Sequence, residues 1–211
     1  MSKGFFISGT DTNVGKTIVA AILVNKIDGI YHKPIQCGLD ESGRKDSDII
    51  KYLCVNKTIL KETYFFKNPV SPNIAAKNEK KKIVISKLLN KICNNFKKKI
   101  IVEGAGGLTV PINKIYLMVD LIKLSKLPLI LVARTSLGTI NHTLLSINLI
   151  TQKKIKFHGL VFVGEDIPET VESILYHGEK IYGKKIEILA KIPKIKKLNK
   201  TKIEEMQELF L

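Results

Sequence analysis

Tryptophan is absent from this 211-residue sequence, and cysteine and arginine are scarce. The three cysteines, Cys37, Cys54 and Cys93, are odd in number and widely spaced, so they offer no disulfide framework and no CxxC metal or redox pair. No apolar run approaches the ~18 residues that a membrane span needs. The N-terminus also has too little apolar length for a signal peptide. These absences predict a soluble protein of the reducing cytoplasm with no membrane partner.

The charge is strongly basic, with a formal net charge of +16 from 35 lysines and arginines against 19 aspartates and glutamates. Only Arg44 and Arg134 are arginines, and the lysines are scattered without interleaved aromatic residues. Proteins that read bases or clamp phosphates in a bidentate manner rely on the planar fork of arginine. We therefore expect no nucleic-acid partner, although the positive field attracts small anions such as nucleotides.

Short runs rich in valine, isoleucine and leucine alternate along the chain with segments of helical spacing. The runs are almost continuously apolar, which is typical of parallel strands covered on both faces. This alternation predicts an α/β fold, an open and mostly parallel sheet with helices on both faces, in which residues 1–211 form one domain. Strands are expected at Phe5–Ser8, Ile30–Pro34, Ile100–Glu103, Leu129–Ala133, Leu160–Val163 and Ile186–Ala190, helices at Thr17–Lys26, Ile83–Phe96, Tyr116–Ser125 and Ile140–Lys153, and an irregular surface loop at Glu62–Asn73.

The first expected strand leads directly into a glycine-bearing loop, Gly9-Thr-Asp-Thr-Asn-Val-Gly-Lys-Thr17, and then into a helix. In such a loop the backbone N–H groups and the helix N-terminus bind phosphate. Lys16 is then placed to reach the β- and γ-phosphates, and the Thr17 hydroxyl to bind Mg²⁺. The first glycine stands one position earlier than in the common GxxxxGK[ST] pattern. The loop predicts a P-loop NTPase type of fold.

Acidic residues follow two of the expected elements. Glu103 ends a buried strand just before a glycine-rich turn, and ligands of open α/β sheets lie beyond such strand ends. Asp46 and Asp48 precede an amphipathic stretch, where capping of a helix is an equally good interpretation. Hard carboxylate oxygens suit Mg²⁺. The sequence thus predicts a magnesium site beside the phosphate loop.

Six motifs occur together and in a fixed order. They are the loop Gly9–Thr17, the segment His32-Lys-Pro-Ile-Gln-Cys-Gly38, Asp46-Ser-Asp48, Pro69–Ala76, Val102–Pro111 and Leu137–His142. With these motifs the chain resembles the dethiobiotin synthetase family, the ATP-dependent cyclo-ligases of biotin biosynthesis. The resemblance extends to about residue 163 and is weak beyond it.

The resemblance implies a homodimer whose substrates are Mg·ATP, the diamine 7,8-diaminononanoate and CO₂. The diamine would form a carbamate, a carbamate oxygen would attack the γ-phosphate, and the second amine would close the cyclic urea with release of phosphate. Such chemistry depends on charge neutralisation and positioning more than on a protein nucleophile.

The resemblance also implies roles for residues of this chain. Lys16 and Lys33 would be catalytic, and Thr17, Asp48 and Glu103 would hold Mg²⁺. The segment Gly138–Asn141 opens a helix, and its free N–H groups would bind the substrate carboxylate across the dimer interface, although Asn141 is equally well interpreted as a helix cap. The nucleotide set is Thr12, Asn13, Val14, Gly15, Lys16, Thr17, Asp48 and Glu103, and the substrate set is Thr12, Lys33, Cys37, Gly106, Gly138, Thr139, Ile140 and Asn141.

Three positions depart from the family pattern. Cys37 stands where serine or threonine is usual, and Asn13 where many members have glutamate. Val163-Gly164 occupies the place of an asparagine that reads adenine. We expect the reaction class to be kept and the selectivity for the base to be weak.

A second function shares this fold, namely a nucleotide-dependent switch of the partition-ATPase type. Those proteins carry a second lysine early in the phosphate loop, where this chain has Thr10-Asp11. The Lys33-Pro34 motif also favours the ligase over the switch.

Overall fold

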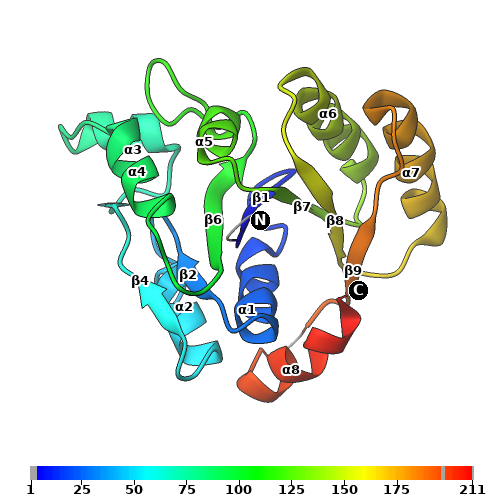
Figure 1. Ribbon diagram of the computed structural model, residues 1–211, viewed down its shortest axis with the longest axis horizontal. Coiled ribbons are helices and arrows are strands. Elements are labelled where there is room, and N and C mark those ends of the chain that lie inside the picture. The colour runs from blue at the N-terminus through cyan, green and yellow to red at the C-terminus, as the bar shows by residue number, and fades with distance from the viewer. Residues whose placement is uncertain (1–3, 196–197, 211) are drawn as a thin grey trace.

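A seven-stranded parallel sheet forms the centre of the protein in the computed structural model, which describes residues 4–195 and 198–210. The strand order is β4-β2-β6-β1-β7-β8-β9, and a separate pair joins β3 to β5 (Figure 1). The open parallel sheet predicted from the apolar runs is therefore confirmed. The strands are β1 Gly4–Gly9, β2 Ile30–His32, β3 Ile35–Cys37, β4 Thr58–Leu60, β5 Tyr64–Phe66, β6 Ile100–Gly107, β7 Leu129–Arg134, β8 Phe157–Val163 and β9 Ile188–Ile192.

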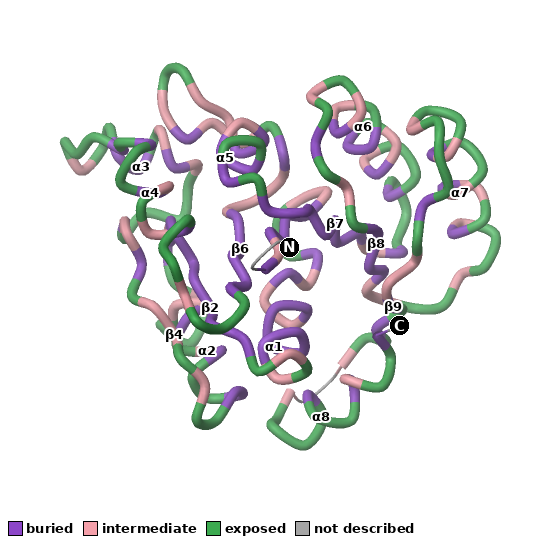
Figure 2. Tube along the Cα trace, in the orientation of Figure 1, coloured by how far each residue is buried: buried purple, intermediate pink, exposed green. Residues whose placement is uncertain are grey.

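Helices cover both faces of the sheet, as the sequence predicts. The apolar residues of α1, α2 and α8 belong to one core cluster, and those of α3 to α7 belong to another. Figure 2 shows the central strands buried between these helices. Among the described residues, no helix has both the length and the apolarity to cross a membrane. The helices are α1 Lys16–Lys26, α2 Asp46–Leu53, α3 Pro72–Asn78, α4 Ile85–Ile92, α5 Met118–Ser125, α6 Thr139–Gln152, α7 Pro168–Tyr182 and α8 Lys200–Glu205, which a 3₁₀ turn, Met206–Leu209, extends.

The apolar runs of the central strands have a simple cause. Neighbouring residues of a strand point to opposite faces, and here both faces are core: Phe6 packs in one cluster and Ile7 in the other. Val102 and Ile101 of β6 divide in the same way. Successive positions along the body of these strands are therefore apolar, and polar residues such as Glu103 follow the apolar run.

The order of the strands assembles the candidate site. Strand β1 lies between β6 and β7, with Ile7 paired to Glu103, so the loop after β1 lies beside the end of β6. Strand β2 lies on the other side of β6, with His32 paired to Val102. Lys33, the next residue, therefore lies next to Glu103. Pro34 then ends the run because proline has no N–H to donate to a strand.

The structure differs from the sequence-based expectation in several places. Strand β9 begins and ends two residues later than expected, and α7 and α8 were not expected. The segment Glu62–Asn73 is not an irregular surface loop, since it contains β5 and the start of α3 and buries Phe66 completely. Its prolines suggested a loop, but Pro72 occupies the first turn of α3, where its missing N–H costs nothing.

Candidate active site

The phosphate loop connects β1 to α1 and ends on Gly15, the residue before the helix. Gly15 has a φ of +96°, a conformation that favours glycine, and a Cβ there would crowd Cγ1 of Val163 at 3.0 Å. The ammonium of Lys16 folds back and donates to the Asp11 carbonyl at 2.8 Å. Burial, and then the nearby charge of Lys33, lower the pKa of Lys16 to about 8. The loop thus presents a cation and a helix N-terminus at one point.

Glu103 lies at the centre of the site and is completely buried. Its Oε1 accepts from the Thr17 hydroxyl at 3.0 Å and from Lys33 Nζ at 2.8 Å, and its Oε2 accepts from the Tyr31 hydroxyl at 2.8 Å. Burial raises the pKa of Glu103, while Lys33 opposes the shift. The carboxylate therefore joins the phosphate-loop helix to β2.

Lys33 is almost fully buried, and three oxygens surround its ammonium. They are Oε1 of Glu103 at 2.8 Å, the Gly104 carbonyl at 3.2 Å and Oδ2 of Asp46 at 2.5 Å. Burial by itself would lower the pKa of Lys33, but the two carboxylates outweigh burial and raise it. Lys33 is thus held as a cation inside the protein.

The two aspartates at the start of α2 have different partners. Asp46 contacts Lys33, and its own N–H donates to Oε1 of Gln36 at 3.3 Å. Asp48 accepts from the Lys45 N–H at 3.0 Å through Oδ2, and its side chain is about half exposed (48%). Asp48 therefore has the capping contact that the sequence left open, and its role as a metal ligand remains a proposal.

The residues expected to bind the reacting end of the substrate come from the phosphate loop, β3 and β6. Both the N–H and the hydroxyl of Thr12 donate to Oδ1 of Asp11. Gly106 has a φ of +66°, and a Cβ on it would lie 3.8 Å from Cγ2 of Thr12. Cys37 is half-buried on β3, and burial raises the pKa of its thiol to about 11. Of the other loop residues, Asn13 is exposed with a φ of +54° and Val14 is buried.

The remaining expected substrate residues form the start of α6. Gly138 is the residue before the helix and has a φ of +89°, so it, rather than Asn141, occupies the N-cap position. The interpretation of Asn141 as a helix cap is therefore wrong, because this residue lies within the first helical turn and is exposed. Thr139 is buried and donates to the Arg134 carbonyl, whereas Ile140 is partly exposed.

Two residues near the site, Tyr31 and Arg134, were not selected from the sequence. Tyr31 is the buried partner of Glu103, and a phenol in a buried strand does signal that a hydrogen-bond partner is needed. Arg134 ends β7, and its guanidinium lies 3.7 Å from the carboxylate of Asp11 in the phosphate loop. No pattern in the sequence pairs Arg134 with Asp11, since the contact depends on β1 lying next to β7.

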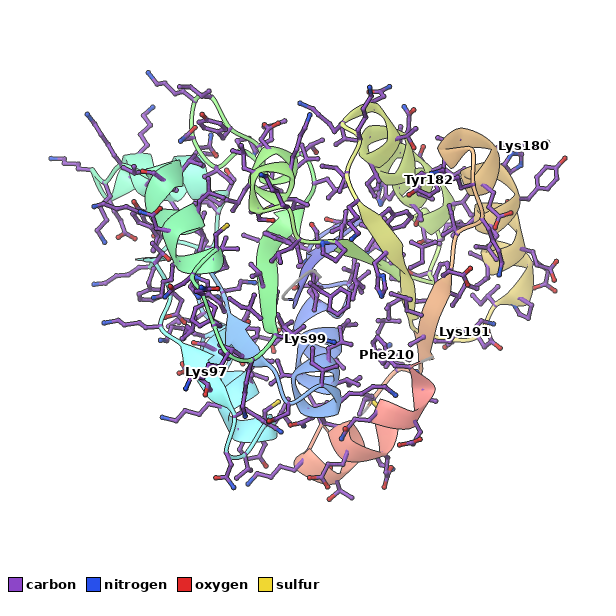
Figure 3. The ribbon with its side chains drawn as sticks, in the orientation of Figure 1. Lys97, Lys99, Lys180, Tyr182, Lys191 and Phe210 are labelled. Atoms are coloured by element: carbon purple, nitrogen blue, oxygen red, sulfur yellow. The ribbon has the colours of Figure 1, made fainter. Side chains whose placement is uncertain are left out.

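A small pocket of about 200 Å³ opens beyond the ends of β8 and β9. Its wall includes Thr135, Gly164, Asp166 and Lys191, and Lys191 binds Asp166 at 2.7 Å. Figure 3 shows Lys191 on β9. Val163, which directly precedes Gly164, lies against Gly15, so the pocket adjoins the phosphate loop.

The donors needed for Mg²⁺ are partly assembled. Thr17 and Glu103 are in contact and supply a hydroxyl and a carboxylate at the start of α1, which fits the preference of Mg²⁺ for a few hard oxygen ligands and retained water. Within the described residues there is no cluster of three or more histidine, cysteine, aspartate or glutamate side chains able to hold a metal. Thr17 and Glu103 therefore fit a site that is completed by nucleotide and water.

Comparison with known proteins agrees with this geometry. A family model described as an AAA domain matches residues 3–202. An ATP-dependent dethiobiotin synthetase BioD from Lawsonia intracellularis is 40% identical over 98% of both chains, and one from Agrobacterium fabrum is 42% identical over 79% of this chain and 77% of the relative.

Solved structures show the same fold at low sequence identity. A ParA family ATPase from Chlorobium tepidum has a TM-score of 0.54 at 14% identity and covers 98% of this chain and 99% of that one. A MinC:MinD cell division complex from Aquifex aeolicus has a TM-score of 0.52 at 14% identity, with coverage of 97% and 85%. These two likenesses concern the fold, whereas the close relatives identify the family. The chain belongs to the ATP-dependent dethiobiotin synthetases.

Proposed function

We propose that this protein closes the ureido ring of dethiobiotin from 7,8-diaminononanoate, CO₂ and ATP, releasing ADP and phosphate. The observation that carries the proposal is the buried ammonium of Lys33, which shares Glu103 with Thr17 of the phosphate loop. This contact brings a fixed cation to the place where a phosphoryl group on the loop would meet a second substrate. A reaction that transfers phosphate to a carbamate needs such a cation.

The proposed reaction has three steps. One amine of the diamine adds to CO₂ and loses a proton, giving a carbamate. A carbamate oxygen then attacks the γ-phosphorus, the bond to ADP breaks, and a carbamic–phosphoric anhydride forms. The second amine attacks the carbamoyl carbon, inorganic phosphate leaves, and the ring closes with loss of a proton.

The residues of the site take roles that follow from their positions. Lys16 and Lys33 neutralise the phosphoryl and carbamate oxygens, which stabilises the charge that develops during transfer. Thr17 and Glu103, with Asp48, hold Mg²⁺, which when bound neutralises the phosphates. Gly15 and its neighbours Thr12, Asn13 and Val14 surround the triphosphate with backbone N–H groups. Glu103 also keeps Lys33 charged and in place.

The diamine is proposed to lie between the phosphate loop and the start of α6. Thr12, Lys33, Cys37 and Gly106 bound its reacting end, and the N–H groups of Gly138, Thr139, Ile140 and Asn141 bind its carboxylate. Leu137, Ile140 and Leu145 expose apolar side chains on this side of the molecule, with Leu137 fully exposed. We therefore propose that a second copy covers this face and that the substrate site lies at the interface of the homodimer. We also propose that each subunit is a single domain and that the protein works in the cytoplasm.

The proposal is tested by measuring phosphate release from Mg·ATP with the purified protein, with and without the diamine and bicarbonate. Release that requires the diamine, together with a product of the mass of dethiobiotin, supports the ligase. Release that is equally fast without the diamine contradicts it and favours a nucleotide-dependent switch.

A further inference from the structure

The ammonium of Lys33 has all its hydrogen-bonding capacity in use. A lysine ammonium donates three hydrogen bonds, and three oxygens contact this one, from Glu103, Gly104 and Asp46. Any substrate oxygen that binds Lys33 must therefore replace one of these acceptors.

The three acceptors differ in how far solvent reaches them. The side chain of Glu103 is 0% exposed, and Gly104 is buried within β6. Glu103 is also fixed from two further directions by Thr17 and Tyr31. The side chain of Asp46 is 25% exposed, and Lys33 is its one side-chain ion-pair partner within the described residues. A ligand that arrives from solvent thus meets Lys33 on the side that Asp46 occupies.

Charge points to the same residue. The resting site holds two lysines, Lys16 and Lys33, and two acidic side chains, Asp46 and Glu103, so bases and acids match in number. A bound triphosphate adds negative charge beside Asp46, and like charges at short distance in a poorly solvated site repel strongly. A bound triphosphate therefore weakens the ion pair between Asp46 and Lys33, which in the resting protein balances the buried charge of Lys33.

The backbone around Asp46 stays anchored when the side chain moves. The Asp46 N–H is held by Gln36, the side chain of Ser47 donates to buried Glu62, and Asp48 holds the N–H of Lys45. Asp46 is the first residue of α2, where the helix dipole favours a carboxylate even without Lys33. The side chain can thus leave Lys33 by rotation alone.

We propose that Asp46 is a displaceable partner of Lys33: in the resting enzyme its carboxylate occupies the position of a substrate phosphoryl oxygen, and it leaves when that oxygen binds. This inference rests on the proposed role of Lys33. It makes Asp46 a positioning residue that keeps Lys33 charged and oriented between turnovers. It also means that Asp46 competes with the nucleotide.

The test compares the affinity for Mg²⁺ with β,γ-methylene-ATP by calorimetry in the parent, Asp46→Asn and the matched control Asp40→Asn. Asp40 lies in the segment between β3 and α2 and pairs with Arg44 at 3.0 Å instead of with Lys33. We expect Asp46→Asn to bind the analogue about three- to tenfold more tightly and Asp40→Asn to bind as the parent does. Unchanged or weaker binding by Asp46→Asn overturns the proposal.

A second comparison separates displacement from a general effect of charge. In a Lys33→Met background, we expect Asp46→Asn to change the affinity less than twofold, because the contact is already gone. An equal gain in both backgrounds overturns the proposal. Thermal unfolding reports whether Lys33→Met folds, and a crystal structure of the parent with Mg²⁺ and the analogue gives an independent answer if it does not. There, Lys33 on a phosphoryl oxygen and apart from Asp46 supports displacement, and an intact pair overturns it.

Separate measurements test the proposed function and the role of Asp46. Diamine-dependent phosphate release by the parent tests the ligase alone. Parent activity combined with unchanged affinity in Asp46→Asn would reject only the role of Asp46.

Discussion

Tyr31 donates its hydroxyl to Oε2 of Glu103 at 2.8 Å, and both side chains are completely buried. Burial, and then the charge of Glu103, raise the pKa of this phenol, so it remains a donor. Tyr31→Phe leaves a buried carboxylate with one partner fewer. We expect a loss of about 1.5–3 kcal/mol in the free energy of unfolding, measured by urea titration. The control Tyr52→Phe, at a half-exposed position (55%), should lose nothing, and equal stability of the two variants would contradict the importance of the Tyr31 hydroxyl.

Lys16→Ala and Lys33→Ala should each lower the turnover number about 100-fold or more, the scale of removing one preorganised electrostatic donor. Steady-state phosphate release with saturating diamine and bicarbonate measures this effect, and circular dichroism checks folding. Lys180→Ala is the control, because this lysine lies on α7 (Figure 3) and its ammonium contacts the ring of Tyr176. A folded Lys33→Ala variant with a near-normal rate would remove Lys33 from the mechanism.

Acid should destabilise the protein through His32. This side chain is 0% exposed, its Nδ1 has no partner among the described residues, and burial, followed by the charge of Lys91, lowers its pKa to about 3. Because the unfolded chain binds a proton near pH 6.5 and the folded chain does not, stability is lost as the pH falls from about 6.5 toward 3. His32 should account for about 2 kcal/mol of the stability lost between pH 7 and pH 5.

His32→Gln should remove most of that difference, as measured by urea unfolding at the two pH values. His177→Gln, on the exposed side of α7, should keep the parental difference. An unchanged acid sensitivity in His32→Gln would show that other groups cause it.

The enzyme should discriminate only weakly between the bases of nucleoside triphosphates. Val163 faces Gly15 and supplies no hydrogen-bonding side chain to the adjoining pocket, and Gly164 supplies only its backbone. A pocket discriminates strongly when a wrong base leaves its buried polar groups unpaired. We expect kcat/KM for ATP to exceed that for GTP or CTP by no more than about tenfold, or 1.4 kcal/mol. A preference well beyond a hundredfold would mean that another group in the pocket reads adenine.

Phe210 should contribute strongly to stability. It is 6% exposed and packs with Ile192 of β9 and with apolar residues of α1, at the position shown in Figure 3. Phe210→Ala should cost about 3–5 kcal/mol in the free energy of unfolding. Its neighbour Leu209 is 40% exposed, so Leu209→Ala should cost much less. Similar unfolding midpoints for the two variants would contradict the packing role of Phe210.

Local patterns predicted the central part of the fold and the position of the site. The strand, glycine loop and helix around Lys16 are contiguous, and Glu103 ends an apolar run, so both are visible along the chain. Local sequence does not show whether Asp46 or Asp48 contacts Lys33. They are two residues apart on one turn, and which carboxylate meets Lys33 depends on how α2 docks through Ser47 and distant Glu62.

Helix α7 and several contacts between strands were also not predicted from the sequence. Helix α7 begins at Pro168 and carries only a few fully buried residues, so its apolar spacing is weak. The partner of Tyr31 and the contact of Arg134 with Asp11 are formed between neighbouring strands that are far apart in the sequence. Such pairings follow from the strand order, which no single segment encodes.

The position of β1 in the middle of the sheet has a consequence for synthesis of the protein. Its neighbour β6 follows roughly 100 residues later, and the apolar outer face of α1 is covered by Ile203, Met206 and Phe210. At about 5–20 residues per second on the ribosome, Phe6 and Ile7 wait at least several seconds for their partners. The nascent N-terminus therefore presents an unpaired apolar strand during elongation, and α1 gains its last apolar cover only after Ile203, Met206 and Phe210 have emerged.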